Sequence, residues 1–402
     1  MNFKNTLAIA FVLILTCTAV SAQNLVETGF KKAEAQTNLM LAEIIKARHR
    51  DSTGVSPRTL SDGQLKLVPS KDWCSGFFPG ELWLLYRHTN NAKWLKLAEA
   101  YTLRLETEKN NGTTHDMGFK IYCSFGTGYA ITANKHYKTV IIEAAKTLAT
   151  RYSAKVDAIK SWDKKEWKFP VIIDNMMNLE LLFEASKLSG DSTFYKIAVS
   201  HANTTLKNHF RPNYSSYHLV SYDPETGEVI KKQTHQGYAD ESAWARGQSW
   251  ALYGYTMCYR ETGNKLYLQQ AENVAKYILQ NPNLPSDLVP YWDYNAPNIP
   301  NEPRDASAAA IVASALYELS GYSQARIKYL KKADAIMESL TQKYMANAGS
   351  NKGFVLLHST GSKPANSEID VPLSYADYYY MEALTRKYNL EKGKPAIALS
   401  PR

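Results

Sequence analysis

The chain has 402 residues, of which 45% are hydrophobic and 12% aromatic, and its 47 Lys and Arg against 38 Asp and Glu give a formal net charge of +9. This composition is that of a globular protein and excludes a disordered or fibrous chain. A positive net charge favours polyanionic partners through long-range attraction. Because the cations are dispersed and form no nucleic-acid reader motif, we expect an acidic saccharide, and no nucleic acid, as the partner.

The first residues predict export. Lys4 precedes an apolar run over residues 7–15, and the small residues at positions 20–22 fit cleavage by a signal peptidase. We therefore expect a signal peptide over residues 1–22, a single domain over residues 23–402, and a periplasmic location. Lipid anchoring through Cys17 is the alternative, which Leu15-Thr16 disfavours because small residues usually precede a lipidated cysteine. No later stretch approaches the 18 or more apolar residues of a membrane span.

The cysteines predict a protein that does not depend on disulfides. Cys74, Cys123 and Cys258 are widely spaced in apolar surroundings, which favours buried free thiols. No CxxC pair or His-rich cluster indicates a metal site, and no glycine-rich loop indicates a nucleotide. We expect no metal and no cofactor.

A weak internal repeat predicts helical hairpins. Five times a helical segment ends in a short polar turn, and a second helix then opens with an aromatic residue. In several copies an alanine follows the aromatic residue by four positions, which puts both on one helix face. These pairs are Trp94 and Ala98, Phe194 and Ala198, Tyr267 and Ala271, and Tyr329 and Ala333. A further hairpin from Val26 to Arg48 and beyond would make six.

Six hairpins with sparse strand signals predict an all-α fold. The expected architecture is an (α/α)6 barrel, a closed toroid of six helical hairpins whose inner helices open onto a central cavity. An open superhelical solenoid is the alternative, because periodicity does not distinguish an open array from a closed one.

Candidate chemistry begins at the expected starts of inner helices. Residues 72–80 combine two glycines and a proline in a tight entry loop, from which Trp73 projects into the cavity or packs against the neighbouring helix. His115 and Asp116 form a charged pair in an apolar segment. Asp116 is a candidate acid-base group, and a helix N-cap is its alternative role.

Asp174 is enclosed by the apolar residues 171–173 and by methionines at 176 and 177. Such surroundings raise the pKa of a carboxyl group toward the range of an acid-base catalyst. A helix N-cap is again the alternative. If Asp174 and Asp116 face one cavity, their charges repel each other and separate their pKa values, as in catalytic carboxylate pairs.

The stretch from Thr234 to Tyr255 gathers the most recognition chemistry. A guanidinium such as that of Arg246 grips a carboxylate with two parallel hydrogen bonds, and the indoles of Trp244 and Trp250 can cover a sugar ring. This combination predicts an acidic sugar as the ligand. The alternative is that the tryptophans anchor the core and that Arg246 is a structural ion-pair partner.

Two later segments complete the candidates. Asp305 is expected to cap the helix that runs to Leu319. The loop over residues 358–363 is rich in hydroxyls, with Ser359, Ser362 and the cation Lys363, and is suited to a sugar or a sulfate. Ordinary surface loops share this composition.

Several of these motifs, taken in order, resemble glycoside hydrolase family 88, the unsaturated glucuronyl hydrolases. The resemblance rests on Trp-x-Ser-Gly-Phe-Phe-Pro-Gly from Trp73, His-Asp-x-Gly-Phe from His115, Ile-Asp-Asn-Met-Met-Asn-Leu from Ile173, and His-Gln-Gly-Tyr from His235 through Ala-Arg-Gly-Gln-x-Trp. It extends to the region of Tyr378. The related unsaturated rhamnogalacturonyl hydrolases have Asn-Gly-Trp where this chain has Gln-Ser-Trp at 248–250, which favours the glucuronyl branch.

The resemblance implies an (α/α)6 barrel that acts on oligosaccharides left by polysaccharide lyases. Such enzymes hydrate the double bond of the terminal 4,5-unsaturated uronic acid. On this basis Asp174 protonates C4 and then assists water in adding to C5, while Asp116 lies close by and keeps Asp174 protonated. A carbohydrate-binding barrel without catalysis and a helical interaction solenoid remain as alternatives.

The resemblance also implies a binding site for the terminal sugar. Its residues are His115, His218, Gln236, Trp244, Arg246 and Trp250, with Arg246 on the carboxylate and the tryptophans stacking on the ring. Ser359, Ser362 and Lys363 resemble a Ser/Lys loop associated with sulfated substrates. Because Lys363 directly follows Ser362, where one intervening residue is expected, a preference for sulfate is left open.

Overall fold

The computed structural model describes residues 3–50 and 52–398, with side chains from Leu25 onward. The long helices are α1 (Phe3–Arg50), α2 (Phe77–Thr89), α3 (Ala92–Leu103), α5 (Lys135–Ala149), α6 (Leu179–Ser189), α7 (Ser192–Asn208), α8 (Ala245–Thr262), α9 (Lys265–Leu279), α10 (Ala306–Leu319), α11 (Arg326–Ser339) and α12 (Ser374–Glu391). A π-helix, Gly118–Gly126, runs directly into the short helix α4 (Thr127–Thr132), and a 3-10 helix, Ile173–Asn178, runs directly into α6.

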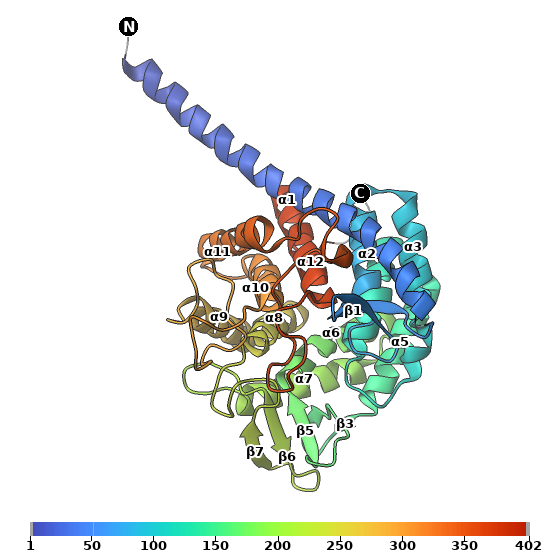
Figure 1. The fold of residues 1–402 in the computed structure, drawn as a ribbon. Helices are drawn as coiled ribbons and strands as arrows, with labels where there is room; N and C mark the ends of the chain where they lie inside the picture. The colour runs from blue at the N-terminus through green and yellow to red at the C-terminus, as the bar shows by residue number, and fades with distance from the viewer. Residues whose placement is uncertain (1–2, 51, 399–402) are drawn as a thin grey trace.

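The helices form two concentric rings (Figure 1). The inner ring consists of α2, the π-helix with α4, α6, α8, α10 and α12, and the outer ring consists of α1, α3, α5, α7, α9 and α11. Each inner helix contacts the next, and α12 contacts both α10 and α2. The ring is therefore closed, which confirms the (α/α)6 barrel and excludes the open solenoid.

The turns between inner and outer helices follow from their sequences. In four hairpins the inner helix ends in a residue of positive φ, and the next residue is an Asn or Asp whose side chain accepts a backbone N–H of the outer helix. The residues of positive φ are Asn90, Ala133, Gly190 and Gly263, and the N-caps that follow them are Asn91, Asn134, Asp191 and Asn264. Each N-cap stabilises its helix by about 1 kcal/mol, so the polar pair defines each hairpin turn.

The predicted aromatic and alanine pairs are confirmed as core contacts of the outer helices. Trp94 and Ala98 are buried, as are the corresponding pairs in α7, α9 and α11. Side chains four positions apart face the same side of a helix, so each pair seals its outer helix against the inner ring.

The prediction for the sixth hairpin is wrong. Its two helices are α1 and α12, from opposite ends of the chain, instead of a hairpin that begins at Val26. A Cβ atom at Gly29 would lie 2.6 Å from Leu384 Cδ1, so α1 packs against α12 without room for a side chain there. The barrel is therefore closed by packing between the two ends of the chain.

In the described part of the chain three small antiparallel sheets accompany the barrel, although strand signals in the sequence are sparse. They pair β1 (Ser56–Ser61) with β2 (Gln64–Val68), β3 (Tyr152–Ser153) with β4 (Ala158–Ile159), and β5 (Phe169–Ile172), β6 (Leu219–Tyr222) and β7 (Val229–Gln233) in that order. The strands are short and lie in the connections between helices, where local periodicity is weak.

The signal peptide expected over residues 1–22 and lipidation at Cys17 fall where side chains are not described. Within the described part of the chain, no helix combines the length and apolarity needed to cross a membrane. Cys74, Cys123 and Cys258 are buried free thiols, as predicted.

Candidate active site

A cavity of about 270 Å³ opens at the end of the barrel where the inner helices begin. Trp73 precedes α2, Asp116 precedes the π-helix, Asp174 lies in the 3-10 helix before α6, Arg246 lies in the first turn of α8 and Tyr375 in that of α12, and all five line the cavity. A helix N-terminus carries partial positive charge. The cavity therefore suits an anionic ligand.

The three-stranded sheet positions the central residues of the site. Ile172 of β5 pairs with Leu219 of β6, which pairs with Gln233 of β7. The chain leaves β5 toward Asp174, enters β6 from His218 and leaves β7 toward Gln236. Because the paired strand ends are adjacent, these three functional side chains from distant parts of the sequence meet at one edge of the sheet.

Asp174 is 8% exposed, and its Oδ2 atom has no hydrogen-bond partner within the described residues. Burial raises the pKa of its carboxyl to about 7; the charge of Arg246 opposes this rise, and the charge of Asp116 adds to it. At neutral pH a substantial fraction of Asp174 is therefore protonated. The direction agrees with the sequence-based prediction, and a group that titrates near 7 is suited to general acid catalysis.

His218 lies beneath Asp174, with 3.7 Å between His218 Nε2 and Asp174 Oδ2. Its Nδ1 accepts the backbone N–H groups of His235 at 2.9 Å and Gln236 at 3.1 Å. An acceptor nitrogen carries no proton, so the remaining proton of the neutral ring is on Nε2, facing Asp174. Burial lowers the pKa of His218 well below its usual value, which keeps the ring neutral.

His115 and Asp116 form a second pair at the cavity. His115 Nδ1 lies 2.8 Å from the carbonyl oxygen of Ser161, which can only accept, so Nδ1 carries a proton. His115 Nε2 then faces Asp116 Oδ1 at 3.2 Å. Burial lowers the pKa of His115. The neutral ring therefore has no proton on Nε2, and this nitrogen can accept a hydrogen bond at the cavity.

Arg246 borders the cavity but is also tied to the protein. Its Nη1 donates to Asp305 Oδ2 at 2.7 Å and to the carbonyl of Thr360 at 2.6 Å, and its Nη2 donates to the carbonyl of Gly361 at 2.5 Å. The structural ion pair raised as an alternative is thus present. Within the described residues three of the five guanidinium N–H groups have acceptors, and the other two can donate to a ligand. Asp305 also caps α10 through Ser307 N and Ala308 N, as predicted.

The predicted aromatic and amide groups divide into two sets. Trp73 and Gln236 line the cavity, and Gln236 Nε2 donates to the carbonyl of Gly361 at 3.3 Å. Trp244 and Trp250 are 2% and 0% exposed and lie beneath the site. The Trp244 ring supports the Arg246 guanidinium at 4.5 Å. The burial of both tryptophans matches the core-anchor alternative and not direct stacking on a sugar, because their faces are covered by protein.

The hydroxyl-rich loop contributes less than its sequence indicated. Ser362 lines the cavity. Ser359 is buried, and its Oγ accepts the backbone N–H of Ser307 at 3.2 Å. Lys363 forms an ion pair with Glu302. Ser359 and Lys363 therefore bind other groups of the protein. Ser362 is the member of the predicted Ser/Lys group that borders the cavity.

Sequence reasoning missed several cavity residues. Arg58 lines the cavity and is neutralised by Glu368, with 2.5 Å between Arg58 Nε and Glu368 Oε1, and by Asp72. Trp162 and Lys164 line it from the loop between β4 and β5. The signal that could have identified this loop is its spacing, with two tryptophans around a short charged run. Nothing in the sequence singles out Arg58.

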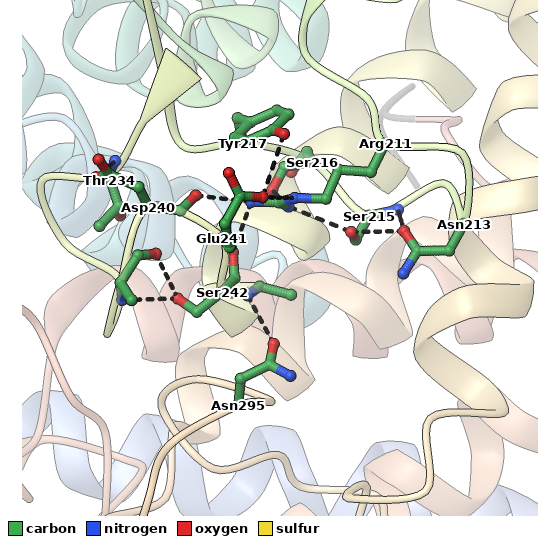
Figure 2. A network of polar contacts seen from close by, with 12 residues as sticks. Arg211, Asn213, Ser215, Ser216, Tyr217, Thr234, Asp240, Glu241, Ser242 and Asn295 are labelled. Carbon is green, nitrogen blue, oxygen red and sulfur yellow. Dashed lines mark hydrogen bonds and ion pairs between the residues drawn. The ribbon is translucent and has the colours of Figure 1, made fainter. Parts of the chain in front are cut away.

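Arg211 ties together the two loops that lead to the site (Figure 2). Its Nη1 donates to the carbonyl of Ser216 at 3.1 Å, and its Nη2 donates to the carbonyls of Asp240 at 2.8 Å and Ser242 at 3.2 Å. The first loop leads into His218, and the second connects Gln236 with α8. Arg211 therefore fixes the relative position of segments that carry site residues.

The comparisons with known proteins agree with this geometry. The model of Glycosyl Hydrolase Family 88 matches residues 50–399. An unsaturated glucuronyl hydrolase of Formosa agariphila is 55% identical over 80% of this chain and 82% of that protein. An unsaturated chondroitin disaccharide hydrolase of Streptococcus pneumoniae is 33% identical over 81% of this chain and 84% of that protein.

A solved structure with a similar fold supports the same family relationship. The crystal structure of an unsaturated glucuronyl hydrolase specific for heparin superposes with a TM-score of 0.86, at 44% identity, over 92% of this chain and 99% of that chain. Sequence and fold thus agree over most of the chain. The chain belongs to glycoside hydrolase family 88 and is a glycoside hydrolase.

Proposed function

We propose that this enzyme removes the 4,5-unsaturated uronic acid from the non-reducing end of oligosaccharides that polysaccharide lyases release from glycosaminoglycans or similar acidic polysaccharides. The observation that carries the proposal is the buried Asp174 carboxyl, whose pKa is raised to about 7 in a cavity at the positive ends of the inner helices. The names of the relatives, which refer to glucuronyl, heparin and chondroitin substrates, support the glucuronyl branch over the rhamnogalacturonyl one.

The proposed reaction begins with transfer of the Asp174 proton to C4 of the double bond. Positive charge then develops at C5, and the Asp174 carboxylate takes a proton from the water that bonds to C5. The resulting hemiketal opens by breaking the bond between C5 and the ring oxygen, and the shortened sugar leaves from C1. Asp174 ends with its proton restored, so one water is consumed in each cycle.

The neighbouring residues have supporting roles. The two free N–H groups of Arg246, together with the Gln236 amide, bind the uronate carboxylate. Neutral His218 donates its Nε2–H toward Asp174 once the carboxyl has lost its proton. The pair of His115 and Asp116 lies against the ring and, through the negative charge of Asp116, keeps Asp174 protonated before the reaction.

The test follows the near-ultraviolet absorbance of the conjugated C4=C5 bond in lyase-generated disaccharides from chondroitin, hyaluronan and heparin. The proposal predicts loss of absorbance on at least one, with deuterium appearing at C4 in D2O. If no disaccharide is consumed while the unhydrolysed sugars bind, this substrate class would be contradicted. Consumption without deuterium at C4 would contradict hydration as the mechanism.

We also propose that the protein is exported to the periplasm after cleavage between residues 22 and 23. Lys4, the apolar run over residues 7–15 and the small residues at 20–22 support this. N-terminal sequencing of the protein from its native cells should start at Gln23. An intact N-terminus would contradict cleavage, and a lipid-modified Cys17 would favour the anchored alternative.

A further inference from the structure

The cavity holds three cations, and their partners differ. Arg58 pairs with Asp72 and Glu368, and Arg246 pairs with Asp305. Lys164 lines the same cavity, yet within the described residues no carboxylate lies within ion-pair distance of its ammonium group. The nearest acidic neighbour in sequence, Asp163, is held at 2.9 Å by Arg151 and at 3.1 Å by Lys160.

The Lys164 ammonium is nevertheless held in a defined place. It lies 4.9 Å from the ring centroid of Trp162 and 5.6 Å from that of Trp167, and its Nζ is 3.1 Å from His235 Nε2. Burial and the charge of Lys164 lower the pKa of His235, so the ring is neutral and accepts this hydrogen bond. An ammonium group has three N–H donors, of which His235 takes one. Among the described residues the other two donors have no acceptor, so they are available to a ligand.

Ring contacts connect Lys164 with the surroundings of Asp174. The Trp162 ring lies 6.0 Å from that of His218, and His218 contacts Asp174. Lys164 is an exposed residue that lines the same cavity as Asp174, and a series of contacts through the Trp162 and His218 side chains connects the two. If the uronic acid lies at Asp174, the leaving sugar occupies the other part of the cavity, where it can contact Lys164.

We propose that Lys164 recognises an anionic group on the leaving saccharide, either a sulfate ester on its first sugar or the carboxylate of the next uronic acid. This inference rests on the proposed function, since it assumes that the unsaturated sugar occupies Asp174. Lys164 takes the role that the sequence suggested for Lys363, whose ammonium is already paired with Glu302. Charge-assisted hydrogen bonds to sulfate or carboxylate are stronger than neutral ones, so the contact discriminates between charged and uncharged saccharides.

The test measures dissociation constants in the Asp174→Asn background, where turnover does not interfere. The ligands are an unsulfated unsaturated disaccharide, a set of disaccharides that each carry one sulfate on the second sugar, and an unsulfated tetrasaccharide. Lys164→Met should weaken binding of at least one sulfated disaccharide, or of the tetrasaccharide, by about tenfold, the effect of one charged hydrogen bond. Binding of the unsulfated disaccharide should change less than twofold.

Matched variants complete the test. Lys165→Met removes the neighbouring exposed cation, which does not line the cavity, and should leave every dissociation constant unchanged. Lys164→Arg should keep the preference because it keeps the charge. Equal weakening of all ligands by Lys164→Met, or no weakening of any, would overturn the inference. Failure of the parent enzyme to consume any ligand would instead count against the proposed function, and the binding comparison would still decide the role of Lys164.

Discussion

His218 Nε2 lies 3.7 Å from Asp174 Oδ2, and it is the nitrogen that carries the proton of the neutral ring. Two backbone N–H groups fix this tautomer by donating to Nδ1. Asp174 Oδ2 has no hydrogen-bond partner among the described residues, and the N–H group that faces it would stabilise the carboxylate. The site thus tolerates both forms of Asp174, as a residue that gives up and regains a proton requires.

Replacing the proton donor should separate catalysis from binding. Asp174→Asn should lower kcat by about 10² to 10⁴, the range attributed to a general acid, because the amide keeps the shape but has no acidic proton. Affinity for an unsaturated disaccharide, measured by calorimetry, should stay within about threefold. Asp62→Asn, at an exposed turn with φ of 49° that asparagine tolerates, is the matched control and should behave as the unaltered enzyme. Comparable turnover by Asp174→Asn would remove Asp174 from the mechanism.

Variants of the Arg246–Asp305 ion pair can distinguish a structural role of Arg246 from a role in binding the ligand. Arg246→Met should lower the free energy of unfolding by about 3–5 kcal/mol, because it leaves the buried Asp305 carboxylate without its partner. Adding Asp305→Asn removes that charge and keeps a side chain able to cap α10, so thermal stability should be largely recovered. KM should remain raised in the double variant. Recovery of a normal KM would show that Arg246 does not bind the substrate.

Arg211 should act on the site without touching it. Arg211→Met removes the bonds between the loops at 215–216 and 240–242, so we expect KM to rise several-fold as Gln236 and His218 lose their fixed spacing. The pH dependence of kcat should not change, because the surroundings of Asp174 are kept. Arg326→Met, on the exposed start of α11, is the control. An unchanged KM would contradict the positioning role.

A buried carboxyl pair outside the site should make stability depend on pH. Glu81 of α2 and Asp377 of α12 are both buried; burial and the charge of Asp377 raise the pKa of Glu81, and burial raises that of Asp377 to about 8. The folded protein therefore keeps protons that the unfolded chain releases near pH 4. The free energy of unfolding falls as pH rises from that range toward 8.

Glu81→Gln should remove much of the loss in the free energy of unfolding at high pH. Thermal denaturation at pH 8 should occur about 2–4 °C higher than in the unaltered protein, the shift that 1 kcal/mol produces in a large domain, and little change is expected at pH 5. Glu166→Gln, at an exposed loop position, is the control. A variant less stable than the parent at both pH values would mean that Glu81 forms a favourable charged contact in the fold.

The local part of the fold could be predicted from the sequence, and the long-range part could not. Trp94 and Ala98 lie four residues apart, so their common face is fixed by helix geometry. The pairing of α1 with α12 depends on contacts such as Gly29 against Leu384, between opposite ends of the chain. No local pattern contains this information.

The same division applies to the site. The apolar neighbours of Asp174 in sequence are also its neighbours in space, so the direction of its pKa shift could be predicted. Whether Trp250 faces the cavity or the core depends on the rotation of α8 against its neighbours, which motifs do not encode. Lys363 pairs with Glu302 across distant loops, and only the folded chain reveals that its charge is already used.

The most direct measurement is the pH dependence of kcat/KM, followed through the absorbance of the C4=C5 bond. Because the reaction needs protonated Asp174, kcat/KM should fall above an apparent pKa of about 7 as pH rises toward 9. His218 should contribute no step in that range, since its pKa lies well below its usual value. A rate that stays constant or rises between pH 6 and 9 would contradict Asp174 as the proton donor.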